Sequence, residues 1–293
     1  MMLDPVMLTR CYARKGFLAP SEIAAFRRGI YALYHATPRP MPWRDTPNPY
    51  HILVSEIMLQ QTQVERVRSK YAEFLSAFPD VGALAGAALA EVLRVWQGLG
   101  YNRRAISLKR CAEVVVEQHG GLLPATCAEL EKLPGIGSYT ARAVAAFAFG
   151  EAQPLIETNI RTVFIHLFFH GREGVSDKEL LPLVAATLDR DNPRDWYYAL
   201  MDYGVGLKQQ HPNPGRRSRH HVRQSRFEGS NRQQRSHLLR LVMAQPGVTD
   251  EELTAALKAD GEQVARNLAA LEKEGFLEQT ATGYRVRGHT EQG

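Results

Sequence analysis

The sequence predicts a mainly α-helical protein with a small separate domain at its C-terminal end. Between residues 21 and 207, apolar side chains recur at helical spacing, as in SEIAAFRRGIYALYHA, which starts at Ser21. Turn signals such as Gly120 and Gly121, rather than strand-like alternation, separate these segments. With 293 residues, 44% of them hydrophobic, the chain is long enough for one large domain or two modest ones.

The tail after Ser236 has a different pattern from the rest of the chain. Three helical segments precede EQTATGYRVRG, a short predicted hairpin, and a capping box of Thr249 and Glu252 opens the second helix. This order is typical of a winged helix-turn-helix, which binds either DNA or another protein. Three basic residues permit DNA contact: Lys258, Arg266 and Arg287.

A basic segment, residues 208–235, joins the two parts. Its only acid is Glu228. The basic residues are Lys208, Arg216, Arg217, Arg219, Arg223, Arg226, Arg232 and Arg235. Such a charge run is usually a solvated linker, but its arginine richness favours a strap that contacts phosphates, because guanidinium groups match phosphate oxygens. We therefore expect a main domain over 1–207, a linker or strap over 208–235 and a tail domain over 236–293.

Composition favours an intracellular protein that meets nucleic acid. The net charge is +5 and the pI about 9.1, which is consistent with nucleic acid as a partner. The three cysteines, Cys11, Cys111 and Cys127, have no metal-ligand spacing and fit a reducing compartment. No apolar run is long enough to cross a bilayer, and the first sixteen residues lack the apolar centre of a secretion signal.

The segment LPGIGSYTARAVAAFAFG, which starts at Leu133, predicts a phosphate-binding hairpin. Gly135 and Gly137 permit a tight turn between two helical stretches. The backbone N–H groups from this turn to Ser138, at the start of the second helix, can hold a DNA phosphate without reading sequence.

A single carboxylate stands in the segment SEIMLQQTQVERV. Glu56 lies among Val54, Ile57 and Leu59 and precedes Gln60. An apolar environment of this kind raises the pKa of a carboxyl group, because desolvation disfavours the anion. Glu56 is therefore a candidate general acid near neutral pH, and a surface glutamate is the alternative.

Four phrases occur together and in order: SEIMLQQTQVERV, WQGLGYNRRAISL, LPGIGSYTARAVAAFAFG and IETNIRTV. On these the chain resembles the helix-hairpin-helix DNA glycosylases, in particular the MutY branch of adenine glycosylases. The resemblance runs from Met41 to Gly206. It implies a two-lobed helical fold with the base pocket between the lobes.

The resemblance also implies roles for two carboxylates. The acid that matches Glu56 protonates the departing adenine in the family. The second family carboxylate is an aspartate, and the matching residue here is Glu157, which keeps the negative charge that an oxocarbenium-like sugar needs. Its extra methylene moves the oxygens by on the order of 1 Å. Asn159 matches the family asparagine, which is expected to hold the backbone or a catalytic water.

Further residues concern base extrusion and strand cleavage. Tyr139 occupies the slot where strand-cleaving relatives carry a lysine that forms a Schiff base, so the resemblance implies a monofunctional enzyme. Gln60, Gln61 and Tyr101 match residues that approach or wedge beside the estranged base, and such inserted groups offset the cost of extrusion. Asn102 departs from a second tyrosine that is common in this phrase.

The four cysteines that hold an iron–sulfur cluster in many relatives are absent from this chain. Lys208, Gly215, Ser218 and Gln224 stand near their positions. We therefore expect no cluster and no other cofactor. The nearby histidines, His211, His220 and His221, are expected to be solvated rather than zinc ligands. The basic strap with Arg216, Arg217 and Arg219 is expected to replace the cluster loop as a DNA contact.

The resulting prediction is a base excision repair enzyme that removes a mispaired base, namely adenine opposite guanine or 8-oxoguanine. Its partner would be duplex DNA with a mismatched or damaged pair, and the protein would be a monomer in the nucleoid-associated cytoplasm. The absence of the nudix-like domain of typical relatives and the presence of Tyr139 leave thymine or uracil removal open. A non-catalytic winged-helix DNA-binding protein is the alternative from another class, although a protein that only binds needs neither Glu56 nor Glu157.

Overall fold

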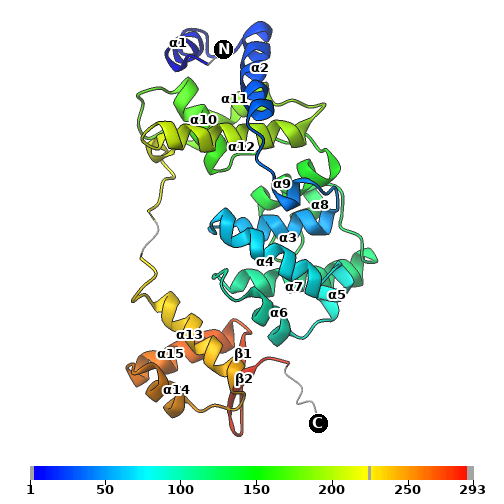
Figure 1. The fold of residues 1–293 in the computed structure, drawn as a ribbon, viewed down its shortest axis with the longest axis vertical. Helices are drawn as coiled ribbons and strands as arrows, with labels where there is room; N and C mark the ends of the chain where they lie inside the picture. The colour runs from blue at the N-terminus through cyan, green and yellow to red at the C-terminus, as the bar shows by residue number, and fades with distance from the viewer. Residues whose placement is uncertain (1–2, 224–225, 289–293) are drawn as a thin grey trace. The chain divides into compact units, whose positions relative to one another are not determined.

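The computed structural model describes residues 3–223 and 226–288 (Figure 1). It confirms the mainly α-helical class, with one small two-stranded sheet in the described part of the chain. Gln224 and residues 289–293, the end of the expected tail domain, lie outside the described residues. The described chain divides into two compact units, and no described helix is long and apolar enough to span a membrane.

The first unit contains residues 1–53, 124–132 and 136–223. Its helices are α1 (Pro5–Lys15), α2 (Pro20–Ala36), η1 (Pro42–Arg44), the start of α3 (Pro49–Leu59), α8 (Cys127–Leu130), α9 (Ser138–Phe149), α10 (Thr158–Phe168), α11 (Asp177–Thr187), α12 (Pro193–Gln210) and η2 (Pro214–Arg217).

An aromatic cluster forms the core of the first unit, where α10 and α12 lie side by side (Figure 1). The ring of Phe26 on α2 lies 5.3 Å from that of Phe168 and 5.7 Å from that of Trp196, both edge-on. Helix α1, which the sequence patterns did not indicate, joins this core through Tyr12, whose ring lies 6.2 Å from that of Phe168. Burial of such rings stabilises this unit, because it removes a large apolar area from water.

A buried aspartate on α12 joins this helix to the segment before α3 in the first unit. Asp202 on α12 accepts hydrogen bonds from Arg39 (2.6 Å) and from both terminal nitrogens of Arg44 (2.7 and 2.9 Å). Its side chain is 4% exposed, so this charge is compensated by the two arginines rather than by water. The segments before α3 are thereby fixed to α12.

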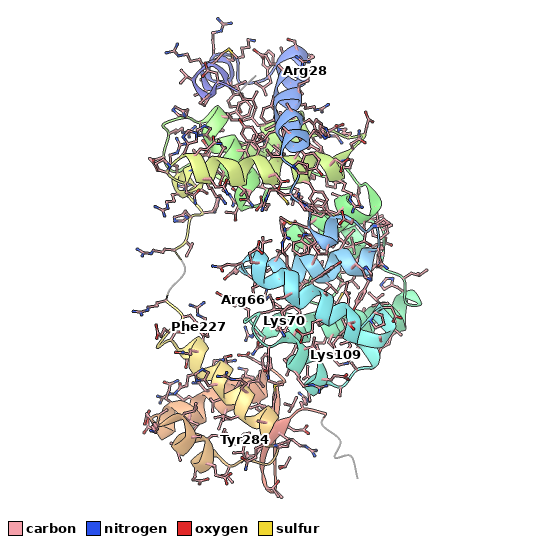
Figure 2. All side chains as sticks on the ribbon, viewed as in Figure 1. Arg28, Arg66, Lys70, Lys109, Phe227 and Tyr284 are labelled. Carbon is pink, nitrogen blue, oxygen red and sulfur yellow. The ribbon has the colours of Figure 1, made fainter. Side chains whose placement is uncertain are left out.

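The second unit contains residues 54–123, 133–135 and 224–293. Its elements are the rest of α3, α4 (Val64–Ala77), α5 (Val81–Gly86), α6 (Leu89–Trp96), α7 (Arg103–His119), α13 (Asn231–Ala244), α14 (Asp250–Leu257), α15 (Gly261–Lys273), β1 (Leu277–Thr280) and β2 (Gly283–Val286). Helix α4 carries Arg66 and Lys70, both labelled in Figure 2, on its polar side, while Phe74 is buried against Trp96.

The tail has the predicted succession of three helices and a hairpin. The capping box at the start of α14 is confirmed: Thr249 Oγ1 accepts from the N–H of Glu252, and a Glu252 carboxylate oxygen accepts from the N–H of Thr249. Strands β1 and β2 pair antiparallel, with Leu277 opposite Val286. Both of these side chains are buried, which turns one face of the hairpin toward the helices.

The expected linker, residues 208–235, is partly folded. Helix α12 continues to Gln210, and α13 begins at Asn231. Between them, Arg219 N–H donates to the carbonyl oxygen of Val175 (2.9 Å), and Val175 N–H donates to that of Arg217 (3.1 Å). This short bridge attaches the segment around η2 to the first unit.

Candidate active site and DNA-contact loops

Glu56 lies in the interior of its unit, on α3. Its exposed fraction is 6%, and those of Val54 and Ile57 are 0% and 2%. Leu59, the third apolar neighbour in the sequence, is only half-buried at the end of the helix. The carboxyl group is thus largely withdrawn from water, as the sequence predicted for a candidate general acid.

Arg104 on α7 joins two separate loops next to this helix. Its Nη1 donates to the carbonyl oxygens of Ile57 (2.8 Å), Met58 (2.9 Å) and Gln60 (2.6 Å). Its Nη2 donates to those of Leu99 (3.2 Å) and Gly100 (3.0 Å), and to Thr62 Oγ1 (3.0 Å). One guanidinium therefore satisfies the carbonyl groups at the end of α3 and fixes the loop before α7.

The two loops that Arg104 connects contain the expected wedge residues. Gln61 has a φ of 54° and Tyr101 a φ of 49°. Side chains other than glycine rarely adopt this left-handed conformation, which costs on the order of 1 kcal/mol or more and persists only where surrounding contacts impose it. Both side chains are exposed. The structure thus presents Gln61 and Tyr101 from two constrained turns that share one buried arginine.

Helix α13 contacts one of these turns within the same unit. Arg232 Nη1 on α13 donates to the hydroxyl of Tyr101 (2.6 Å), and its guanidinium lies 5.7 Å from the ring centroid. Nearby, Glu274 accepts from both Arg103 (2.8 Å) and Arg235 (2.7 Å). The basic start of α13 is therefore attached to the loop that carries the expected wedge tyrosine.

The predicted hairpin has the backbone that its glycines indicated. Gly135 has a φ of +74°, and a Cβ atom there would lie 2.4 Å from the Cβ of Ser107, so only glycine fits. Gly137 is the N-cap of α9 and has no side chain to occupy the first N–H groups of the helix. Ser138 is exposed beside it, and Tyr139 is half-buried in the first turn. Such a turn leaves backbone donors available to an anion.

Glu157 is the N-cap of α10, in the first unit. Its Oε1 accepts from the N–H groups of Asn159 (2.6 Å) and Ile160 (2.8 Å), and its Oε2 accepts from the side-chain amide of Asn159 (3.2 Å). Burial raises the pKa of Glu157, while the two backbone donors and the charges of Lys208 and Arg161 act in the opposite direction. The longer side chain thus still occupies the position of a helix cap.

Comparison with known proteins decides the family. Residues 54–182 match the model of the "HhH-GPD superfamily base excision DNA repair protein". The chain is 35% identical over 283 residues to the adenine DNA glycosylase of Mycolicibacterium smegmatis, covering 90% of this chain and 97% of that protein. It belongs to the adenine DNA glycosylase branch of the helix-hairpin-helix superfamily.

Other relatives show the same branch and the same fold. The human adenine DNA glycosylase is 36% identical over 197 residues, which cover 63% of this chain and 36% of the human protein. A thermostable thymine-DNA glycosylase structure matches with a TM-score of 0.56 and 28% identity, over 62% of this chain and 86% of that one. An endonuclease III–DNA complex matches with a TM-score of 0.55 and 19% identity, over 64% and 86%, which supports the fold alone.

Two features of this glycosylase could not be identified from the sequence. Arg104 donates hydrogen bonds to both wedge loops, and its acceptors Ile57 and Gln60 lie 47 and 44 positions away in the chain. Lys208, which the sequence pattern placed in a basic linker, lies in the last turn of α12 and donates to the side-chain oxygen of Asn159 (2.6 Å). The only unusual feature of Lys208 in the sequence was that it stands near the position where many relatives have a cluster cysteine.

The arginines of the strap differ from one another in this glycosylase. Arg216 and Arg219 are exposed. Arg217 is half-buried and donates to the carbonyl oxygen of Phe169 (3.3 Å), and burial lowers its pKa.

Among residues 3–223 and 226–288, no group of three or more histidine, cysteine or acidic side chains is arranged to hold a metal ion.

Proposed function

We propose that this protein is a monofunctional DNA glycosylase that removes adenine opposite guanine or 8-oxoguanine. The observation that carries the proposal is Glu56, a buried carboxyl group on an apolar helix inside the segment that matches the family. Support for adenine comes from the relatives, since proteins named adenine DNA glycosylase are 34–38% identical to this chain in bacteria and mammals.

In the proposed reaction, Glu56 and Glu157 act on one extruded nucleotide. Glu56 donates a proton to the adenine, which weakens the bond between the base and C1′. As this bond breaks, its electron pair leaves with the base, and the Glu157 carboxylate stabilises the positive charge that develops on the sugar. Water then adds to C1′ and loses a proton to a carboxylate, which gives an abasic site.

Strand cleavage is not part of this proposal. Tyr139, in the first turn of α9, has no amine and cannot form an imine with the opened sugar. The product would therefore be an abasic site in an intact strand, which breaks only on treatment with alkali. The enzyme would act as a monomer without an iron–sulfur cluster, since the chain lacks the cysteines for one.

DNA binding is assigned to three parts of the chain. The hairpin with Gly135, Gly137 and Ser138 would hold a phosphate through backbone N–H groups. Gln60, Gln61 and Tyr101 would fill the space that the extruded base leaves. The basic segment 208–235 would contact the phosphate backbone through Arg216 and Arg219, and would join a catalytic domain over 1–207 to a tail domain over 236–293.

A panel of mismatched duplexes tests this function. We expect single-turnover excision of adenine opposite 8-oxoguanine and guanine, seen as strand breaks only after alkali. Excision of thymine or uracil opposite guanine, with adenine left intact, would favour a thymine or uracil mismatch glycosylase. The 28% identity to a thymine-DNA glycosylase supports this second candidate. Tight binding without release of any base would contradict both enzymes and favour a DNA-binding protein.

A further inference from the structure

Lys208, Asn159 and Glu157 form a chain of hydrogen bonds from the end of α12 to the start of α10. The ammonium of Lys208 donates to Asn159 Oδ1 (2.6 Å), and Asn159 Nδ2 donates to Glu157 Oε2 (3.2 Å). All three side chains are half-buried, and all three belong to the first unit. We propose that Lys208 is a positioning residue of this glycosylase, which orients the Asn159 amide and places a positive charge beside the Glu157 carboxylate.

The first part of the proposal concerns the orientation of an amide. A lysine ammonium has donors and no acceptor, so it bonds only the oxygen of the Asn159 side chain. This leaves the amide nitrogen directed at Glu157 Oε2, while Oε1 accepts from two backbone N–H groups. Both carboxylate oxygens thereby have fixed donors, and the plane of the carboxylate is set. A close approach of α12 supports this geometry, because a Cβ atom on Gly204 would lie 2.4 Å from the carbonyl oxygen of Asn159.

The second part concerns charge. Burial raises the pKa of Glu157, and Lys208 is one of the two cations that oppose this effect. The other, Arg161, is tied to Asp177 on α11 by two contacts of 2.7 Å, so its charge is already balanced. From η2, which packs on α10, the guanidinium of Arg217 is bonded to Phe169 instead. Lys208 is therefore the cation whose charge favours the ionised form of Glu157, the form that stabilises a cationic sugar.

The environment of Lys208 fits this role. Burial lowers its pKa, and the charge of Glu157 raises it again. Each of the two groups thus favours the ionised form of the other across one amide. Exposed lysines that serve only as phosphate contacts are not held in this way, because their ammonium groups stay in water.

The proposal rests on the proposed role of Glu157, and the experiment separates the two. Single-turnover excision of adenine is measured against pH for the wild type and for Lys208→Met, Lys208→Gln and Glu157→Gln, with DNA affinity measured in parallel. Lys15→Met is the matched control, because Lys15 forms an ion pair with Glu22 (2.9 Å) elsewhere in the first unit.

We expect K208M to lower the rate at neutral pH by about tenfold, with little change in DNA affinity. Its pH–rate profile should lose activity at a higher pH than the wild type, by about one unit, because Glu157 protonates more easily without the cation. K208Q retains a donor for Asn159 but has no charge, so it should keep the shifted profile with a smaller loss of rate at high pH. K15M should match the wild type.

Three outcomes decide the matter. A wild-type pH profile in both Lys208 variants, with E157Q inactive, would overturn the positioning role and leave the proposed function intact. An E157Q variant as fast as the wild type would contradict the proposed function itself. If K208M does not fold, the pH–rate profile of K208Q is the test, and a profile that is not shifted from the wild type overturns the proposal.

Discussion

Arg104 Nη1 donates a hydrogen bond to the carbonyl oxygen of Gln60 over 2.6 Å, although the two residues are 44 positions apart. The same guanidinium bonds the carbonyl oxygen of Gly100, next to Tyr101. Both loops of the proposed wedge thus depend on one buried cation, whose pKa burial lowers to about 10, so that it stays charged at neutral pH.

Loss of the Arg104 guanidinium should lower the stability of the fold and the affinity for a mismatched duplex. We expect Arg104→Met to lower the free energy of unfolding by on the order of 3 to 5 kcal/mol, since several carbonyl groups lose their donor. Arg104→Lys keeps the charge but cannot form the fork, so an intermediate loss is expected. Urea denaturation and hydrogen exchange at Gln61 and Tyr101 measure the effect. Arg110→Met, at an exposed position of the same helix, is the control; equal stability of R104M and R110M would contradict this account.

The contact between Arg232 and Tyr101 should couple α13 to DNA recognition. Arg232→Ala and Tyr101→Phe each remove the hydrogen bond between the guanidinium and the hydroxyl. If this contact holds the ring ready for insertion, each variant lowers affinity for a mismatched duplex by a few-fold, and the double variant is no weaker than either one. The measurement is a double-mutant cycle on dissociation constants, and strictly additive effects would count against the coupling.

The exposed arginines of the strap should determine part of the salt dependence of DNA binding. Each phosphate contact contributes about 0.9 to the slope of log affinity against log salt, so Arg216→Ser and Arg219→Ser should each flatten it by about that amount. Arg217→Ser should instead lower stability, because its side chain bonds Phe169. Arg28→Ser, an exposed arginine of α2 labelled in Figure 2, is the control. If the salt dependence of DNA affinity is unchanged in R216S and R219S, the strap does not contact the phosphate backbone.

Asp202 should be among the most important charges for stability. Asp202→Asn leaves Arg39 and Arg44 without a carboxylate in a buried site, and breaking such a group costs about 3 to 5 kcal/mol. The readout is the urea midpoint by circular dichroism. The exposed Asp45 gives a control, Asp45→Asn, for which we expect almost no change. A midpoint for D202N equal to that of D45N would show that the buried pair contributes little.

The sequence was sufficient to predict features that depend only on residues close to one another in the chain. The capping box of Thr249 and Glu252 and the tight turn at Gly135 depend on neighbouring residues, and both were predicted from the sequence. Glu56 could be identified as buried because its neighbours in the helix are apolar.

Features that depend on distant partners could not be predicted in this way. Helix α1 is held by Tyr12 against Phe168, more than 150 residues away, and Leu8 is its one buried residue. Lys208 belonged to a run of basic residues whose usual state is solvated, and only the packing of α12 on α10 brings it to Asn159. The roles of Arg104 and Lys208 follow from the fold rather than from their sequence neighbours.

Single-turnover excision by Glu56→Gln tests the central claim most directly. The variant is compared with the wild type on a duplex with adenine opposite 8-oxoguanine, and Glu65→Gln, on the exposed side of α4, is the control. We predict that E56Q binds the duplex as the wild type does but releases adenine at least about a hundredfold more slowly, because no acid protonates the base. Full-speed excision by E56Q would contradict the account.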